Sequence, residues 1–165
     1  PSQDLGAARE LLAGYRRMLA SIADEHGLLV SASGTHPLAR WDSQKASPKA
    51  RYNKLMHDLQ MLGARNILCG MHVHVSVPDP STRIELMRRL LPFLPVFLAL
   101  STSSPYWQAK RTGLMGYRLA AYDELPRTGI PELFADEAEY RDYIDALVRC
   151  RAIPDESYIW WAVRP

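Results

Sequence analysis

Apolar side chains recur at every third or fourth position in several stretches of the chain, which is the period of a helix with one buried face. This spacing predicts helices over residues 3–26, 49–62, 81–102 and 137–151. Ser2 is the predicted N-cap of the first helix, because a serine hydroxyl accepts backbone hydrogen bonds there. The third helix is predicted to be interrupted at Pro92 or Pro95, since proline lacks a backbone N–H.

Residues 66–77 (NILCGMHVHVSV) carry the clearest strand pattern, because two kinds of side chain alternate along them. One face is predicted to lie in the core and holds an apolar row of Ile67, Cys69, Met71, Val73, Val75 and Val77. The other face holds Gly70, His72, His74 and Ser76. The pattern therefore predicts a strand that is anchored on one side and offers polar chemistry on the other.

Shorter strands are predicted elsewhere, over residues 28–33, 113–122 and 157–164. The last of these contains Trp160 and Trp161, whose side chains must point to opposite faces of a strand. We therefore expect one of the two tryptophans in the core and the other beside a site. The intervening segments are predicted to be loops.

The composition is that of a folded protein, with 47% hydrophobic and 23% charged residues. No apolar run reaches the roughly 18 residues that a membrane span needs, so no membrane association is predicted. Two cysteines, Cys69 and Cys150, do not make a disulfide framework, which favours a reducing compartment and a cytoplasmic protein.

The charge is unevenly distributed, although the net value is only +2. Residues 1–122 hold fifteen Lys and Arg against eight Asp and Glu, whereas residues 123–165 hold five against ten. No stretch interleaves basic and aromatic residues, so a nucleic-acid partner is not predicted. The basic excess suits a site that handles phosphates or carboxylates.

The polar face of residues 66–77 is the first candidate site. Alternate side chains of a strand lie about 6.5–7 Å apart, so His72 and His74 could reach one metal ion or one phosphate chain. Gly70 on the same face is predicted to leave room for a ligand to approach the backbone, and Ser76 adds a hydroxyl. The alternative is a polar sheet edge that binds no ligand.

Arginines in two loops form the second candidate. Arg118 follows the Thr112-Gly113 turn, and Arg127 lies in the sequence LPRTG. An arginine can hold a carboxylate or a phosphate through two parallel hydrogen bonds. The alternative is that these arginines pair with the acidic C-terminal region in a solvated loop. A third candidate, His36, is expected to be structural.

Seven blocks of sequence carry a family resemblance: GTHPLARW, RYNKL, CGMHVHVSVPD, LPFLPVFLALSTSSPYWQ, TGLMGYR, LPRTG and IWWAVRP. In their order and spacing they resemble the GCS2-type carboxylate-amine ligases, the glutamate–cysteine ligase type 2 family with its YbdK-like members. The resemblance covers about residues 29–165. The segment GMHVHVS is also similar to a glutamine synthetase strand that bears a metal-binding histidine and a nucleotide-contacting histidine.

The resemblance implies a fold, a reaction and its cofactors. The fold would be an α+β domain with a mainly antiparallel sheet, part of a glutamine synthetase-like catalytic domain in which residues 1–165 form a single partial domain. The reaction would be ATP-dependent joining of a carboxylate to an amine, of the γ-glutamyl-cysteine type, through an acyl phosphate. ATP and Mg²⁺ would be required, and the partners would be an amino acid carboxylate and an amine.

The resemblance also assigns roles to individual residues. His72 would bind the metal, while His74, Ser76 and Arg164 would contact the nucleotide. Arg118 and Arg127 would be catalytic, steadying the transferring phosphoryl group or the substrate carboxylate.

Departures from the family pattern keep a second hypothesis open. The family's usual acidic motifs before and after these blocks are absent, which favours a central fragment. An open sheet edge in such a fragment would favour a homo-oligomer. Arg111 and Ala162 stand where the family usually has aspartates. An inactive or truncated relative that binds a nucleotide or a partner is therefore the alternative. A metal-dependent hydrolase is a third hypothesis, but no histidine follows His74 to complete a zinc site.

Overall fold

The computed structural model describes residues 4–45 and 47–165, and the chain divides into two compact units, Pro1–Ala32 and Ser33–Pro165. The first unit contains helix α1, Leu5–Glu25, which confirms the predicted first helix. The predicted cap Ser2 lies outside the described residues. Asp4 is the N-cap, and its carboxylate accepts hydrogen bonds from the backbone N–H groups of Gly6 and Ala7.

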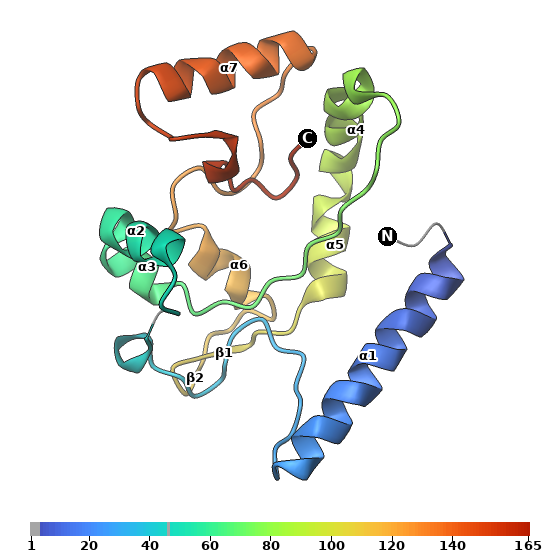
Figure 1. Ribbon diagram of the computed structural model, residues 1–165, viewed down its shortest axis with the longest axis vertical. Helices are drawn as coiled ribbons and strands as arrows, with labels where there is room; N and C mark the ends of the chain where they lie inside the picture. Colours follow the sequence, from blue (N-terminus) through green and yellow to red (C-terminus); the bar gives the residue numbers. More distant parts are fainter. Residues whose placement is uncertain (1–3, 46) are drawn as a thin grey trace. The chain divides into compact units, whose positions relative to one another are not determined.

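The regular secondary structure of the second unit is mainly helical in its described part (Figure 1). Its helices are α2 (Ala50–Leu59), α3 (Met61–Arg65), α4 (Arg83–Leu90), α5 (Leu94–Ser101), α6 (Tyr117–Tyr122) and α7 (Glu137–Arg149). Short 3₁₀ turns lie at Trp41–Ser43, Pro80–Thr82, Leu91–Phe93 and Glu156–Tyr158. A two-stranded antiparallel sheet joins β1 (Tyr106–Trp107) to β2 (Lys110–Arg111), with Tyr106 opposite Arg111. These elements agree with a partial α+β domain, in which the sheet is much smaller than predicted.

The main core of the second unit lies between α4, α7 and the C-terminal segment. Its buried side chains are Ile84, Met87, Phe134, Tyr140, Ile144, Ile153, Ile159 and Trp161. Their spacing on α4 and α7 is helical, as the apolar pattern predicted. The break between α4 and α5 falls at the 3₁₀ turn containing Pro92, which confirms the predicted interruption. No described helix combines the length and the apolar character needed to span a membrane.

The predicted strand over residues 66–77 is wrong. The segment runs as an extended connection between α3 and α4 (Figure 1), and its only β pairing in the described part is a bridge between Leu68 and Thr35. The predicted apolar face is also wrong, since Cys69 is exposed and Met71 and Val73 keep 77% and 78% of their surface in contact with solvent. An alternating pattern gives a strand only where a second strand supplies backbone hydrogen bonds. Within this segment, only Leu68 and Cys69 have such partners among the described residues, namely Thr35 and Gly34.

Three shorter predicted strands are also absent. Residues 28–33 are irregular, and residues 117–122 form helix α6 because the Ser104 hydroxyl accepts the Arg118 backbone N–H at the start of the helix. In the segment 157–164, residues 157 and 158 end a 3₁₀ turn that Asp155 caps, and residues 159–164 are irregular. Backbone hydrogen bonds to residues 127 and 129 hold this last segment in place without forming a regular strand.

Candidate functional site

A buried network joins three distant loops of the second unit. Ser104 and Thr35 are each 2% exposed, and the Thr35 hydroxyl donates to the backbone carbonyl of Tyr106 at 2.8 Å. The Gly34 backbone N–H donates to the Ser103 hydroxyl at 3.1 Å, and the Gly34 carbonyl accepts the Cys69 backbone N–H at 2.9 Å. The network fixes the start of α6 against the extended segment that carries the two predicted site histidines.

Arg118 lies in the first turn of α6 and is connected to this network through its backbone. Its backbone N–H donates to the Ser104 hydroxyl at 2.9 Å, and its half-buried side chain runs past Gly34 and Gly70. A Cβ at Gly70 would overlap Nη2 of Arg118 and lie 3.1 Å from Cζ. The prediction that Gly70 leaves room for a ligand to approach the backbone is therefore wrong, because the guanidinium of Arg118 fills that space.

The charge of Arg118 is not neutralised by a carboxylate in the described part of the chain. The ion pairs found there use other arginines, namely Arg40, Arg65, Arg88, Arg89 and Arg141. The buried Nε of Arg118 has no hydrogen-bond partner, and the guanidinium lies 5.4 Å from the ring centre of Tyr122. A buried donor without a partner costs free energy, and no described residue satisfies this one.

The side chains of His72 and His74 lie on the same side of the extended segment, as predicted. Their ring centres are 6.3 Å apart, with the planes inclined at 42°. Both imidazoles and Ser76 are exposed, so none of them is held in an apolar core. The pair is accessible to a ligand that arrives from solvent.

The described residues do not by themselves fit a magnesium ion. Mg²⁺ prefers an octahedral set of oxygen ligands, whereas His72 and His74 offer nitrogen. Across residues 4–45 and 47–165, no group of three or more His, Cys, Asp or Glu side chains converges on one point. These residues therefore form no complete magnesium site, and a zinc hydrolase site gains no third ligand from them either.

Tyr122 packs against the guanidinium of Arg118 and was not predicted from the sequence. Burial raises the pKa of its hydroxyl, while the positive charges of Arg118 and Arg164 act in the opposite direction. The phenol therefore stays protonated at neutral pH. The charges of Arg118 and Arg164 therefore act on one side chain, although the two arginines are 46 residues apart in sequence.

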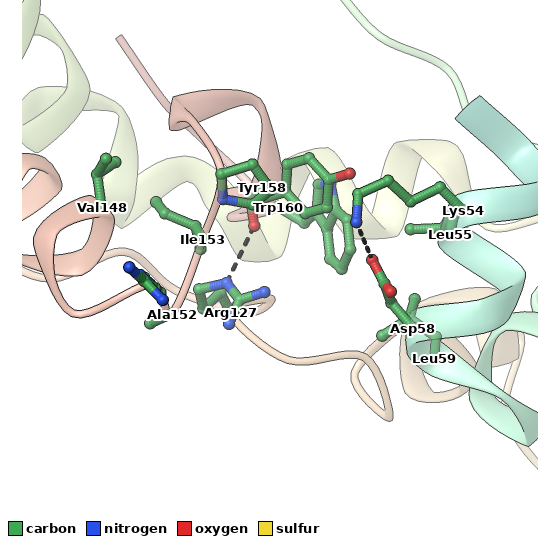
Figure 2. Close-up of a pocket in the computed structure, with 12 residues that line it drawn as sticks. Lys54, Leu55, Asp58, Leu59, Arg127, Val148, Ala152, Ile153, Tyr158 and Trp160 are labelled. Atoms are coloured by element: carbon green, nitrogen blue, oxygen red, sulfur yellow. Dashed lines mark hydrogen bonds and ion pairs between the residues drawn. The ribbon is translucent and has the colours of Figure 1, made fainter. Parts of the chain in front are cut away.

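Arg127 lies in a separate cavity of about 580 Å³, shown in Figure 2. Its backbone has a φ of 58°, an uncommon conformation for a residue with a side chain. The Trp160 backbone N–H donates to the Arg127 carbonyl at 2.9 Å, and Arg127 Nε donates to the Tyr158 carbonyl at 3.1 Å. The guanidinium also lies 5.9 Å from a ring centre of Trp160. These contacts orient the side chain, and Lys54 and Asp58 form an ion pair on the same cavity wall.

The prediction that one of the two tryptophans lies in the core is confirmed, although the segment forms no strand. Trp161 is buried in the core, whereas Trp160 lines both the cavity of Arg127 and a second one of about 470 Å³. Tyr122 lines that second cavity too. The cavity of Arg127 and the cavity of Tyr122 are therefore neighbours, since Tyr158 and Trp160 line both of them.

Arg164 and His36 make mainly backbone contacts. Arg164 is exposed, and its Nη1 donates to the backbone carbonyl of Ile159. His36 Nδ1 accepts the backbone N–H groups of Leu38 and Ala39, at 3.2 and 3.0 Å. The structural interpretation of His36 is thus confirmed, since this imidazole closes a turn.

A family model, described as Glutamate-cysteine ligase family 2, matches residues 1–165. The chain belongs to Glutamate-cysteine ligase family 2. A protein of Bradyrhizobium sp. (strain ORS 278) is 54% identical over 162 residues, which cover 98% of this chain and 40% of that protein. Proteins of Rhodospirillum rubrum and of Roseiflexus sp. (strain RS-1) are 46% and 41% identical, covering 98% and 100% of this chain. All three carry the name "Putative glutamate--cysteine ligase 2".

The chain spans about 40% of the length of these family members. Arg111 and Ala162, the two positions where the resemblance led us to expect aspartates, are both exposed. Arg111 lies in β2 opposite Tyr106, and the Ala162 backbone N–H donates to the Gly129 carbonyl. Neither side chain contributes a hydrogen bond to the network around Arg118, so neither residue changes the contacts that hold Arg118.

Proposed function

We propose that the chain is the central part of an ATP-dependent carboxylate-amine ligase that forms an amide of the γ-glutamyl-cysteine type. The family membership supports a ligase. The single observation that carries the proposal is the guanidinium of Arg118, which has an unsatisfied buried Nε and lies against the segment bearing His72 and His74. Residues 1–165 are proposed to belong to one catalytic domain.

The proposed reaction has two steps with one anionic intermediate. A carboxylate oxygen attacks the γ-phosphorus of ATP, and ADP leaves to give an acyl phosphate. The amine nitrogen then attacks the acyl carbon, phosphate leaves, and an amide remains. Both steps concentrate negative charge on phosphoryl oxygens, which fixed cations stabilise more in the transition state than in the ground state.

The proposed roles follow from what each side chain offers. Arg118 holds the transferring phosphoryl group, and Arg127 holds a carboxylate at the neighbouring cavity. His74, Ser76 and Arg164 contact the nucleotide, and His72 would supply one ligand to magnesium. The partners proposed are small molecules, an amino acid carboxylate and an amine. A cytoplasmic location and a homo-oligomer complete the proposal.

Release of ADP tests this function directly. We expect the full-length protein, given ATP, Mg²⁺ and glutamate, to release ADP faster when cysteine is added. The measurement is a coupled ADP assay with each substrate omitted in turn. ATP binding without carboxylate- or amine-stimulated ADP release would instead support the inactive, nucleotide-binding relative.

The exposed histidine pair gives a second test. We expect His72→Ala to weaken ATP binding in the presence of Mg²⁺ by about tenfold, because one ligand contact of roughly 1.4 kcal/mol is lost. Titration calorimetry on the full-length protein measures this. His57→Ala is the matched control, since His57 is equally exposed but lies on α2. Equal weakening by both variants would mean that the pair has no part in nucleotide binding.

A further inference from the structure

Two glycines flank the side chain of Arg118 at its two ends. A Cβ at Gly34 would lie 3.2 Å from Cβ and 3.1 Å from Cδ of Arg118. A Cβ at Gly70 would overlap Nη2 and lie 3.1 Å from Cζ. All of these contacts are closer than ordinary van der Waals contact, so a larger residue at either position would displace the side chain of Arg118.

These glycines are not required by the backbone conformation. Gly27, Gly113 and Gly129 have φ values of 65°, 85° and 82°, which explain glycine by themselves. Gly34 and Gly70 do not appear among the residues with positive φ. At these two positions a Cβ would instead meet the side chain of Arg118, which would have to move aside.

The two glycines are held rigidly relative to each other. The Gly34 carbonyl accepts the Cys69 backbone N–H at 2.9 Å, and the next residue, Thr35, is bridged to Leu68. The Gly34 N–H is bound in turn by the Ser103 carbonyl and hydroxyl. Backbone held in this way cannot yield to the arginine, so the arginine must fit the backbone.

We propose that Gly34 and Gly70 form a glycine slot whose role is to position the Arg118 guanidinium for the phosphoryl group. The ring of Tyr122, 5.4 Å from the guanidinium, adds a further contact. Gly34 and Gly70 are positioning residues, since they touch Arg118 and no reacting atom. This inference rests on the proposed function for the identity of the anion, but the seating of the arginine is a property of the chain itself.

A double-mutant cycle tests the slot. We expect Gly70→Ala to lower the rate of ADP release by about 10- to 100-fold, because a displacement of about 1 Å is enough for a loss of that size. In an Arg118→Ala background the same glycine substitution is expected to have no further effect. Gly14→Ala is the matched control, since a Cβ at Gly14 meets nothing within 4 Å. Equal losses with and without Arg118 would overturn the proposal.

A second readout does not depend on catalysis. The ¹⁵N–¹H NMR signal of Arg118 Nε, assigned through its absence in Arg118→Lys, is expected to shift and to exchange faster with water in Gly70→Ala but not in Gly14→Ala. An unchanged signal would overturn the slot even in an active enzyme. A shifted signal in a protein that releases no ADP would retain the slot and reject the proposed function. Should Gly70→Ala not fold, restored folding of Gly70→Ala/Arg118→Ala would support the slot, and failure of both would overturn it.

Discussion

Arg118→Ala is expected to lower ADP release by the full-length protein by at least about 10²-fold, the loss typical of removing one fixed donor to a developing anion. The guanidinium is held between Gly70 and the ring of Tyr122, and its buried Nε has no partner in the described part of the chain. A group already held in place supplies charge without reorganising during the reaction. The measurement is the steady-state rate at saturating ATP, so that reduced binding is separated from reduced turnover.

Two further variants make this prediction specific. Arg118→Lys keeps the positive charge but loses the planar donor pair, so we expect only partial recovery of the rate. Arg89→Ala is the control, because Arg89 is exposed on α4 and pairs with Glu85 at 2.7 Å. It is expected to leave the rate within about twofold of the unchanged protein, as an exposed ion pair contributes little. Full activity in Arg118→Ala would remove the main support for the ligase site.

The helices could be predicted from the sequence because their pattern is local. Residues 3–26 and 137–151 contain α1 and α7, and the break at Pro92 follows from a missing backbone donor. The strand over 66–77 could not be predicted correctly, since a strand needs hydrogen bonds from another segment. Alternation of side chains describes how a strand would be buried, not whether a partner is present.

The site was predictable only in its chemical groups. Arg118 and Arg127 could be proposed from the sequence because an arginine among turn residues is a recognisable anion binder. Tyr122, Gly34 and Ser104 were missed, because their roles come from contacts with residues distant in the sequence. Gly70 was expected to leave room for a ligand, but the space beside it is filled by Arg118 of α6. A contact between residues so far apart in the sequence cannot be predicted from a local pattern.

The second large effect is on stability, and Tyr140 is the residue expected to show it. Tyr140 is fully buried, its ring meets that of Phe134 at 5.4 Å, and its hydroxyl donates to Glu156 at 2.6 Å. Tyr140→Ala removes an aromatic ring from the core between α4 and α7 and leaves a cavity. We expect the free energy of unfolding to fall by about 3–5 kcal/mol, measured by urea denaturation.

Tyr140→Phe separates the ring from the hydroxyl. It keeps the packing and removes only the bond to Glu156, which still pairs with Arg141 at 2.9 Å, so we expect a loss of about 1–2 kcal/mol. Tyr106→Ala is the control, because this tyrosine is 46% exposed and its loss is expected to cost no more than about 0.5 kcal/mol. Equal losses for Tyr106→Ala and Tyr140→Ala would mean that this core does not stabilise the protein.

The pH dependence of the free energy of unfolding is a second, independent test of the role of Tyr140. Burial, and then the hydrogen bond to Glu156, raise the pKa of Tyr140 above its ordinary value of 10.0. The folded state therefore holds this proton more tightly than the unfolded state does. Its contribution to stability is complete below pH 10 and is lost as the pH rises further, because the unfolded chain then releases the proton first. Urea denaturation at pH 9 and pH 11 is expected to show this decrease, and Tyr140→Phe to reduce it.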